Sequence, residues 1–523
     1  MKKHMTAAML AALSLSLTAC GSSNSTTTTT EAATTAAATA AEEESSADTE
    51  RGTGDSYSAE EEGAHAIDAD GTEASYDNIS VSKTGDSDAG DEADFYGTNA
   101  AVIAQNGGTL NITNSKIDTQ AAYGNAVFSY GEGSTVNISD STITTSEHNS
   151  GGVMVTGGGT LTADNLDVTT QGGSSAAIRS DRGGGTLTVN GGTYETNGSG
   201  SPAIYSTADI TANNAKLTAN VAQAVVVEGK NSVTLNDCDV TGDNTVQNSD
   251  KTDLLQAVML YQSMSGDAES GKSSFTMNGG TLTSKNAGMF FVTNTVAEIN
   301  LKNVEMNYAT DDLLRIQSEG WGNEGENGGQ VTMNAEDQSL EGTITVDANS
   351  NLNLYLTGNS SFSGKIDNAG KVFVSLSDDA TWTLSGDTEI SGLSCSKDAI
   401  NLNGYKLTVN GTEYQEGTES TGEAIETVTY ESHQNSQPEM PPQDGEGKGG
   451  PKKDGQAPQG KPADGEKPAD APEKPEGSDD QKPADAPKKP EGDDDHKPGD
   501  KPDGKPGEKS ESTASATEES KAQ

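Results

Sequence analysis

The residues with the most direct potential for chemistry are two adjacent carboxylates and a guanidinium, Asp311, Asp312 and Arg315. Paired carboxylates can act as general acid and base on a glycosidic bond, and an arginine can stabilise a developing anion. Here the three residues are contiguous, and alternation along an expected strand turns Arg315 away from Asp311. None of the five histidines lies nearby, and no Ser-His-Asp, zinc or phosphate-loop spacing occurs. We therefore expect an acidic turn before a strand, with catalysis as the alternative.

A second group of charged residues lies in the segment 86–94, where five carboxylates fall within nine residues. Oxygen ligands at alternating spacing suit Ca²⁺. The segment departs from the EF-hand pattern, because Gly90 comes one position early and Gly97 stands where the closing glutamate would be. We expect no cofactor to be required. The candidate metal ligands, with a solvated acidic cap loop as the alternative, are Asp86, Asp88, Asp91 and Asp94.

These groups must be positioned by a repeating element. Asn, Asp or Gly recurs roughly every 23 to 26 residues, with one longer gap, between two strand-like apolar runs. These residue types tolerate the left-handed backbone conformation, so the pattern predicts one sharp bend per coil of a right-handed parallel β-helix. We expect an all-β solenoid with almost no helix. The bend column is Asn114, Asp140, Asn165, Gly191, Asn214, Asp237, Gly279 and Asn303.

The strand before each bend alternates apolar inward positions with outward Thr or Asn, which we expect to form polar ladders between coils. After the bend, small residues such as Cys238 point inward, and we expect Cys238 and Cys395 to be buried and unbridged. The predicted inward column is Leu110, Val136, Leu161, Leu187, Ile210, Val233, Phe275, Ile299 and Val331.

A second strand of each coil carries apolar and aromatic residues on its outward face, where Thr and Ser are expected. Exposed apolar stripes usually contact a partner, and aromatic rings at the coil spacing can stack on sugar rings. The alternative is that a loop, a tail or a second molecule covers the face. The candidate ligand-binding residues of this column are Phe128, Tyr130, Arg179, Tyr205 and Met259.

Loops that interrupt the repeat offer a second candidate site, because solenoids usually place function there. The longer gap suggests excursions around 241–256 and 262–273, and the loop 318–330 carries Trp321, which we add to the candidate ligand-binding residues. Arg179 and Arg182 flank Asp181, and we expect a solvated ion pair there.

Composition narrows the class of protein. Hydrophobic residues make up 31% of the chain and aromatic residues 4%, too little for a globular domain of 523 residues but enough for a solenoid with a thin core. The net charge of −49 argues against nucleic acid as a partner and against direct adhesion to anionic lipid.

Both ends of the chain differ from the repeats. Residues 1–20 form a leader ending in Leu17-Thr18-Ala19-Cys20-Gly21, which resembles the lipobox of bacterial lipoproteins. The resemblance implies that Cys20 is acylated and anchors the protein in a lipid bilayer of the cell envelope, facing outward. Residues 21–60 then form a disordered tether. Residues 416–523, rich in Pro, Lys, Asp and Glu, form a disordered tail that is a spacer or, alternatively, contacts cell-wall polymer.

The repeats divide into coils with an N-terminal cap at 61–340 and shorter rungs at 341–415, where we expect no bend column. Residues 380–387 resemble the C-terminal rungs of bacterial β-helical adhesin passengers. The chain as a whole resembles bacterial surface lipoproteins with an adhesin-like or pectate-lyase-like β-helix. The segment 310–316 is similar to elements of pectin-degrading hydrolases, without their Gly-His-Gly.

We therefore expect a non-catalytic, adhesin-like surface protein that binds extracellular polysaccharide or host glycan. One alternative is a polysaccharide lyase or glycoside hydrolase. The other is a structural stalk with no specific ligand.

Overall fold

The computed structural model describes residues 51–427. The leader with Cys20, residues 21–50 of the expected tether and the tail after 427 lie outside these residues. The described part is all-β, with one six-residue helix, α1 (Asp91–Tyr96). None of its helices has the length and apolar character needed to cross a membrane.

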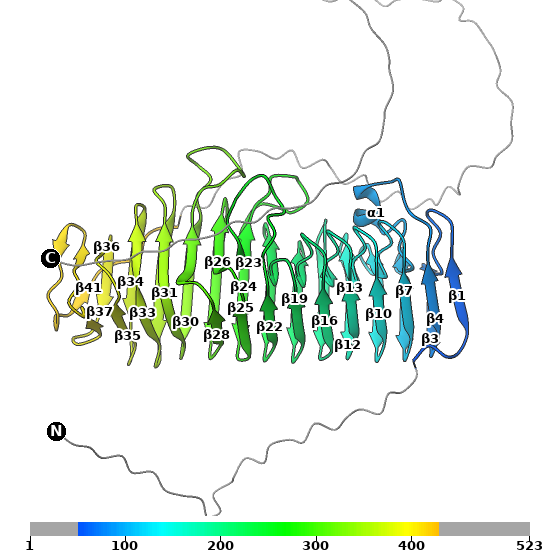
Figure 1. Cartoon of the computed structure of the whole chain (residues 1–523), viewed down its shortest axis with the longest axis horizontal. Helices are drawn as coiled ribbons and strands as arrows, with labels where there is room; N and C mark the ends of the chain where they lie inside the picture. Colours follow the sequence, from blue (N-terminus) through cyan, green and yellow to red (C-terminus); the bar gives the residue numbers. More distant parts are fainter. Residues whose placement is uncertain (1–50, 428–523) are drawn as a thin grey trace, which may run out of the picture. The chain divides into compact units, whose positions relative to one another are not determined.

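Three long sheets, named here sheets A, B and C, run along the molecule (Figure 1). The chain visits B, C and A in turn, so neighbouring strands within a sheet come from successive coils. Apart from the last strand of sheet C, the pairing in these sheets is parallel, which is compatible with the expected parallel β-helix. Sheet A contains β1 (Ser56–Ala59), β4 (Ser80–Lys83), β7 (Lys116–Thr119), β10 (Thr142–Thr145), β13 (Asp167–Thr170), β16 (Thr193–Thr196), β19 (Lys216–Ala219), β22 (Asp239–Gly242), β25 (Thr281–Ser284) and β28 (Glu305–Tyr308).

Sheet B carries the face on which the candidate site is built. Its strands are β2 (Ile67–Asp70), β5 (Val102–Gln105), β8 (Val127–Tyr130), β11 (Val153–Thr156), β14 (Ile178–Arg179), β17 (Ile204–Ser206), β20 (Val225–Glu228), β23 (Gln256–Tyr261), β26 (Gly288–Thr293), β29 (Asp312–Ile316), β31 (Ser339–Val346), β33 (Ser361–Asn368), β35 (Thr381–Leu384) and β38 (Ile400–Asn401).

Sheet C carries the strands that precede the bend. Its strands are β3 (Glu73–Asp77), β6 (Thr109–Thr113), β9 (Thr135–Ser139), β12 (Gly159–Asp164), β15 (Gly185–Asn190), β18 (Asp209–Asn213), β21 (Ser232–Asn236), β24 (Lys272–Asn278), β27 (Val296–Lys302), β30 (Gln330–Glu336), β32 (Asn351–Thr357), β34 (Lys371–Leu376), β37 (Gly392–Cys395) and β41 (Ser420–Thr421). A small C-terminal sheet adds β36 (Thr388–Ile390), β39 (Leu407–Val409) and β40 (Thr412–Glu413).

The predicted bend column is confirmed. All eight of its residues have positive φ, from 47° at Asp140 to 67° at Gly191 and Gly279. The residues before them pair in register from coil to coil, so the bends are stacked. Polar ladders run beside them: the Asn165 Nδ2 donates to Asp140 Oδ1 at 2.8 Å, and the Asn213 Nδ2 donates to Asn190 Oδ1 at 2.9 Å.

We expect Asn165→Val to destabilise the protein by about 1–2 kcal/mol, because a β-branched residue resists the left-handed conformation and loses the bond to Asp140. Asn165 is exposed, so lost packing does not contribute to the measured change in stability. The matched control is Asn165→Gly, which we expect to change stability little, since glycine already occupies this column at Gly191. Urea unfolding measures both, and equal losses for the two variants would contradict the bend argument.

The core is a thin column of apolar side chains between the three sheets, and its members from Leu110 to Ile299 are almost fully buried. One register assignment is wrong: Ile299 pairs with Met333, and Val331 pairs with Ala297. Both Val331 and Met333 face inward, because a slip of two residues keeps a side chain on the same face of a strand. Cys238 and Cys395 are buried and free, as predicted.

The C-terminal section also corrects the prediction. The bend column does not stop at Asn303, because Asp337, Gly358 and Asp378 continue it with φ of 49°, 64° and 57°. Sheet A is what stops, with β28 as its last strand, whereas sheets B and C continue to the end of the solenoid. The rungs after 337 are shorter because the chain passes directly from sheet C to sheet B.

The boundaries differ from expectation at both ends. Strand β1 begins at Ser56, inside the expected tether, and pairs with β4. At the other end β41 pairs antiparallel with β37, and the Asn353 side chain exchanges hydrogen bonds with the backbone of Ile425. The part of the expected tail up to Ile425 therefore packs on sheet C.

Candidate functional site

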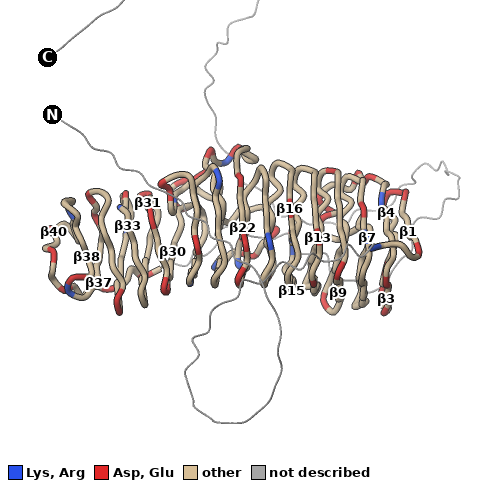
Figure 2. Tube along the Cα trace, turned by 60° about the horizontal axis from the view of Figure 1, so that its bottom comes forward, with Lys and Arg blue, Asp and Glu red and all other residues tan. Residues whose placement is uncertain are grey.

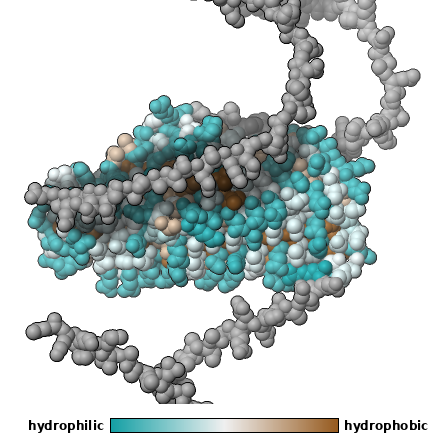
Figure 3. Space-filling view, viewed as in Figure 1, coloured by the Kyte–Doolittle hydropathy of each residue, from teal (hydrophilic) through white to brown (hydrophobic). Residues whose placement is uncertain are grey.

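A groove lies over the outward face of sheet B, between α1 and the loops that follow β22, β23 and β29. In Figure 1, α1 and these loops rise from the same side of the coil. The surface is otherwise mostly hydrophilic, with small apolar patches (Figure 3), and acidic residues are spread along its length (Figure 2). The groove is therefore the place where apolar and buried charged groups meet solvent.

The N-terminal end of the outward stripe is not exposed, which corrects the prediction for Phe128. Phe128 and Met154 are fully buried in a small cluster with Ile103 and Ala100. Gly97, with φ of 67°, lies so close that a Cβ there would be 2.9 Å from the Phe128 ring. Tyr130 is half-buried against this cluster. Because α1 covers this end, Phe128 serves packing and is not a surface contact for a ligand.

Met259 is corrected for the same reason. It is 4% exposed in a second cluster with Val226 and Phe291, under the loops that carry Leu254 and Trp321. Phe291 lies on β26, a strand that was not predicted although the bend at Asn303 in the same coil was. The aromatic residues at the edge of this cluster, Tyr205, Tyr261 and Trp321, are only partly buried. They are the members of the stripe and loops that a ligand can reach.

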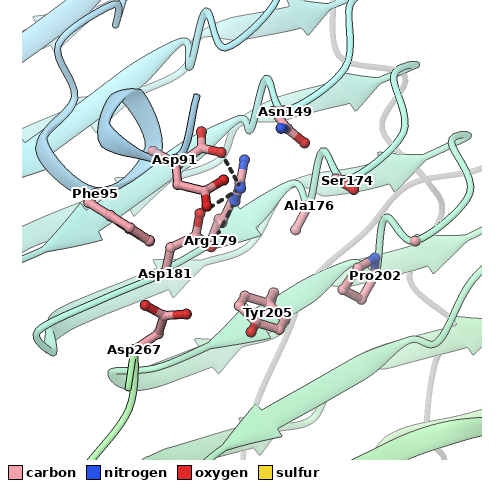
Figure 4. A pocket seen from close by; sticks show the side chains of 12 residues that line it. Asp91, Phe95, Asn149, Ser174, Ala176, Arg179, Asp181, Pro202, Tyr205 and Asp267 are labelled. Carbon is pink, nitrogen blue, oxygen red and sulfur yellow. Dashed lines mark hydrogen bonds and ion pairs between the residues drawn. The ribbon is translucent and has the colours of Figure 1, made fainter. Parts of the chain in front are cut away.

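Arg179 is the centre of a buried charge cluster rather than a solvated ion pair (Figure 4). Its Nη2 lies 2.9 Å from Asp94 Oδ2 and 2.5 Å from Asp181 Oδ2, and its Nε donates to Asp181 Oδ1 at 2.9 Å. The three side chains are only 5–10% exposed. Asn125 Nδ2 completes the cluster by donating to Asp94 Oδ1 at 2.9 Å. Arg179 thus joins α1 to sheet B.

Two carboxylates share one guanidinium here, so the cluster carries an excess of negative charge when all groups are ionised. Burial raises the pKa of Asp181 to about 7, against the opposing effect of Arg179. Burial raises the pKa of Asp94 as well, and Arg179 and Asn125 oppose that shift. The cluster therefore holds a proton over part of the neutral range, and Arg179 remains charged.

Arg182, which follows β14, links the loop after β23 to α1 through an ion pair on one side and a cation–π contact on the other. Arg182 Nη2 lies 2.5 Å from Asp267 Oδ1, and the guanidinium carbon lies 3.8 Å from the centre of the Phe95 ring. Asp267 and Phe95 both line the first of two adjoining cavities, of about 340 Å³, together with Asp91, Asp181 and Tyr205. This end of the groove is polar and acidic.

The second cavity, of about 210 Å³, shares Gly200, Pro202 and Tyr205 with the first, so the two form one groove. Its walls are aromatic and amide side chains. Tyr261 and Trp321 make an edge-to-face contact with centroids 5.3 Å apart. Gln223 lines the cavity, is 6% exposed, and its Oε1 has no hydrogen-bond partner. Other lining residues are Gln247, Asn248, Thr252 and Leu254.

The aromatic walls are held in place from beneath. Glu228 Oε2 accepts hydrogen bonds from the Tyr205 hydroxyl at 2.5 Å and the Tyr261 hydroxyl at 2.9 Å, and Ser263 donates to Oε1. Burial raises the pKa of all three groups, Glu228, Tyr205 and Tyr261. On the loop side, Asn327 Nδ2 donates to the Trp321 carbonyl at 2.8 Å. The two tyrosine rings and the backbone of Trp321 are therefore held in place before any ligand arrives.

The predicted calcium site is not formed by the four aspartates. Asp94 is paired with Arg179, Asp91 lines the cavity, and Asp86 accepts a hydrogen bond from the backbone of Ala122 at 2.8 Å. The backbone N–H of Asp88 donates to Glu62. Within residues 51–427 no three His, Cys, Asp or Glu side chains are grouped so that they could hold a metal ion.

The segment 310–316 does not contribute to the groove. Arg315 forms an ion pair with Asp312, and Asp311 accepts a hydrogen bond from the Thr343 hydroxyl at 3.1 Å. As expected, Arg315 does not meet Asp311 but lies on strand β29 beside Leu314 and Ile316. The alternative catalytic group therefore lacks a cavity shared by its three residues.

Sequence reasoning missed Asn125, Gln223 and Asp267 and underestimated Asp181. One signal was available for Asp181: Arg179 occupies a position that pairs with Met154 on one side and Tyr205 on the other. An arginine in an otherwise apolar column needs a carboxylate partner if a loop covers the face. Asp267 comes from the loop after β23 and Asp94 from α1, and the repeat does not encode how these segments fold over sheet B.

The chain matches no protein-family model, no curated protein and no solved structure, so its function has to be argued from this groove.

Proposed function

We propose that the protein binds an extracellular glycan in the groove over sheet B, without cleaving it, as a right-handed parallel β-helix displayed at the cell envelope. The handedness follows from the near-universal right-handed crossover between parallel strands. The lipid anchor rests on the Leu17–Gly21 motif and on acylation of Cys20. The observation that carries the proposal is the second cavity, which is lined by aromatic rings and by Gln223, whose buried Oε1 has no hydrogen-bond partner.

Aromatic faces and amide side chains are the two groups that recognise sugars most directly. Rings stack on the apolar faces of a pyranose, and amides exchange hydrogen bonds with its hydroxyl groups. Trp321, Tyr261 and Tyr205 supply the rings, and Gln223 offers a buried acceptor whose lack of a partner is costly in the free protein. A ligand hydroxyl that satisfies this acceptor gains affinity at that position.

The shape of the groove favours an oligosaccharide over a single sugar. The two cavities share Gly200, Pro202 and Tyr205 and together extend over several strands of sheet B. Glu228 pre-orders the tyrosine rings and Asn327 holds the Trp321 backbone, which reduces the entropy lost on binding.

We expect the purified full chain to bind at least one glycan on an array, and Trp321→Ala to weaken that binding at least about tenfold. Gln223→Met keeps the side-chain volume and removes the amide, so it should weaken binding without loss of thermal stability. The matched control is Tyr405→Ala, an aromatic residue that is 41% exposed and lies outside the groove. Calorimetry on the hit, with and without Ca²⁺, provides the measurement.

An array without hits on a correctly folded chain would overturn the proposal and favour the structural stalk. Binding that survives both Trp321→Ala and Gln223→Met would place the glycan elsewhere on the molecule. A requirement for Ca²⁺ would indicate that the acidic segment 86–94 binds the ion.

Hydrolysis is the second candidate, favoured by one observation. Asp181 has a pKa raised to about 7 by burial and lines an open cavity with Asp91 and Asp267, and a partly protonated carboxyl can act as a general acid. Chromatography of the glycan after long incubation separates the two functions. Cleavage that is abolished by Asp181→Asn would support the enzyme.

A further inference from the structure

Sheet A ends abruptly in the middle of the molecule. Its last strand, β28, pairs with β25 on one side, whereas sheets B and C continue for several more coils. The next coil passes from β30 to β31, and β31 pairs with β29 rather than β28. The outer edge of β28 therefore has no strand beside it within residues 51–427.

The edge of β28 presents main-chain hydrogen-bonding groups. In a parallel pair, alternate residues direct their N–H and C=O groups to opposite sides. The Glu305 N–H donates to Gly280 on the β25 side at 2.9 Å. Val304 faces the other way, where the Gln338 amide caps it: Val304 N–H donates to Oε1 at 2.7 Å, and Nε2 donates to the Val304 carbonyl at 2.8 Å. By the same alternation, Met306 and Tyr308 direct their main-chain groups outward.

A groove of about 970 Å³ follows this edge. It opens where β31 diverges, at a register irregularity between Asp312 and Leu314. Met306 points inward like its neighbour Leu282, yet Met306 is half-buried and Leu282 is fully buried. The difference arises because the next strand covers Leu282, whereas within residues 51–427 no further strand of sheet A lies beside Met306. The groove thus has the position of one further strand, and Met306 is an apolar contact within a mostly polar lining.

We propose that this groove binds one extended peptide segment of a partner polypeptide, which pairs with β28 as an eleventh strand of sheet A. Strand addition to an open sheet edge is a general mode of peptide recognition. Glu305, Asp311 and Glu341 line the groove, so the segment should carry a basic residue followed by an apolar one. The apolar residue covers Met306, and the basic residue lies beside Glu305 and forms an ion pair with it.

Strand β19 of the chain itself has this pattern. Lys216 pairs with Asp239, Asp239 with Thr281, and Thr281 with Glu305, so Lys216 belongs to the same column as Glu305. Leu217 belongs to the column of Met306. A synthetic peptide of residues 213–221 is therefore a suitable probe for the edge.

We expect this peptide to bind the full chain and to slow amide hydrogen exchange at Met306 and Tyr308. Met306→Pro removes an N–H that faces the groove and leaves the pairing with β25 intact, so it should weaken binding at least about tenfold. Glu305→Lys should weaken binding of the same peptide. A peptide carrying Lys216→Glu should bind this Glu305→Lys variant with about the affinity of the original pair. Fluorescence anisotropy measures affinity, and a peptide with Leu217→Asp is the matched control.

Three results would overturn the proposal. One is absence of binding at millimolar peptide. Another is equal affinity for the original and charge-swapped pairs. The third is protection of the Met306 and Tyr308 amides in the full chain before peptide is added, which would show that the chain covers its own edge.

Discussion

Replacing Arg179 with methionine is expected to destabilise the protein by about 3–5 kcal/mol, the typical cost of removing one partner from a buried ion pair. Asp94 and Asp181 would remain buried without their cation, with side chains 5% and 10% exposed. Each carboxyl that is still ionised would have to take up a proton. More of this carboxyl charge is present at pH 8 than at pH 5, so the loss should be larger at pH 8. Because Asp94 lies in α1, hydrogen exchange should quicken first in α1 and the strands under it.

The matched control is Arg315→Met, which removes an ion pair with Asp312 whose side chains are 35% and 23% exposed. Solvent screens that pair, so we expect a loss below about 1 kcal/mol. Urea unfolding followed by circular dichroism compares the two variants, and exchange measured by mass spectrometry locates the change. Similar losses for Arg179→Met and Arg315→Met would show that the buried cluster is not held by its charge.

The second large effect is a loss of stability as pH rises from about 4 to about 7. The folded protein keeps a proton on Asp181, whose pKa is raised to about 7 by burial, whereas the unfolded chain releases it near pH 4. Folded protein therefore binds more protons in this window, and stability falls as they are released. Glu228, whose pKa burial also raises, acts in the same direction.

Asp181→Asn removes this titration. The difference in the free energy of unfolding between the variant and the natural chain should therefore shift in favour of the variant by on the order of 2 kcal/mol as pH rises from 4 to 8. Thermal unfolding across this pH range measures the difference. The control is Asp367→Asn, a surface carboxylate paired with Lys365 and 50% exposed, which should leave the pH profile unchanged. Parallel profiles for Asp181→Asn and the natural chain would mean that Asp181 stays ionised throughout.

The bends and strands were predictable because they depend on local backbone preference and on alternation. Asn114, Asn165 and Asn214 could be recognised from their recurrence, since Asn tolerates the positive φ that each bend requires. The same local logic placed Cys238 inside the coil. It failed at Val331, because a slip of two residues leaves the inward and outward pattern of a strand unchanged.

The site was only partly predictable. Arg179, Tyr205 and Trp321 were identified as unusual residues, but the sequence could not tell which side chains of the stripe would be covered. Phe128 and Met259 face outward from sheet B as predicted, and they are buried because α1 and the later loops fold over them. That outcome depends on contacts between segments far apart in the chain, such as Arg179 with Asp94 and Arg182 with Asp267.

The sequence by itself therefore determined the repeating coil, since a period of bends and alternating strands is written in every repeat. Only the tertiary structure decided where sheet A ends, which aromatic residues reach solvent, and which carboxylates share Arg179. The physical reason is that the coil follows from interactions of each residue with its own neighbours and the coil beside it. The groove follows from loops whose position is fixed only by long-range burial and charge pairing.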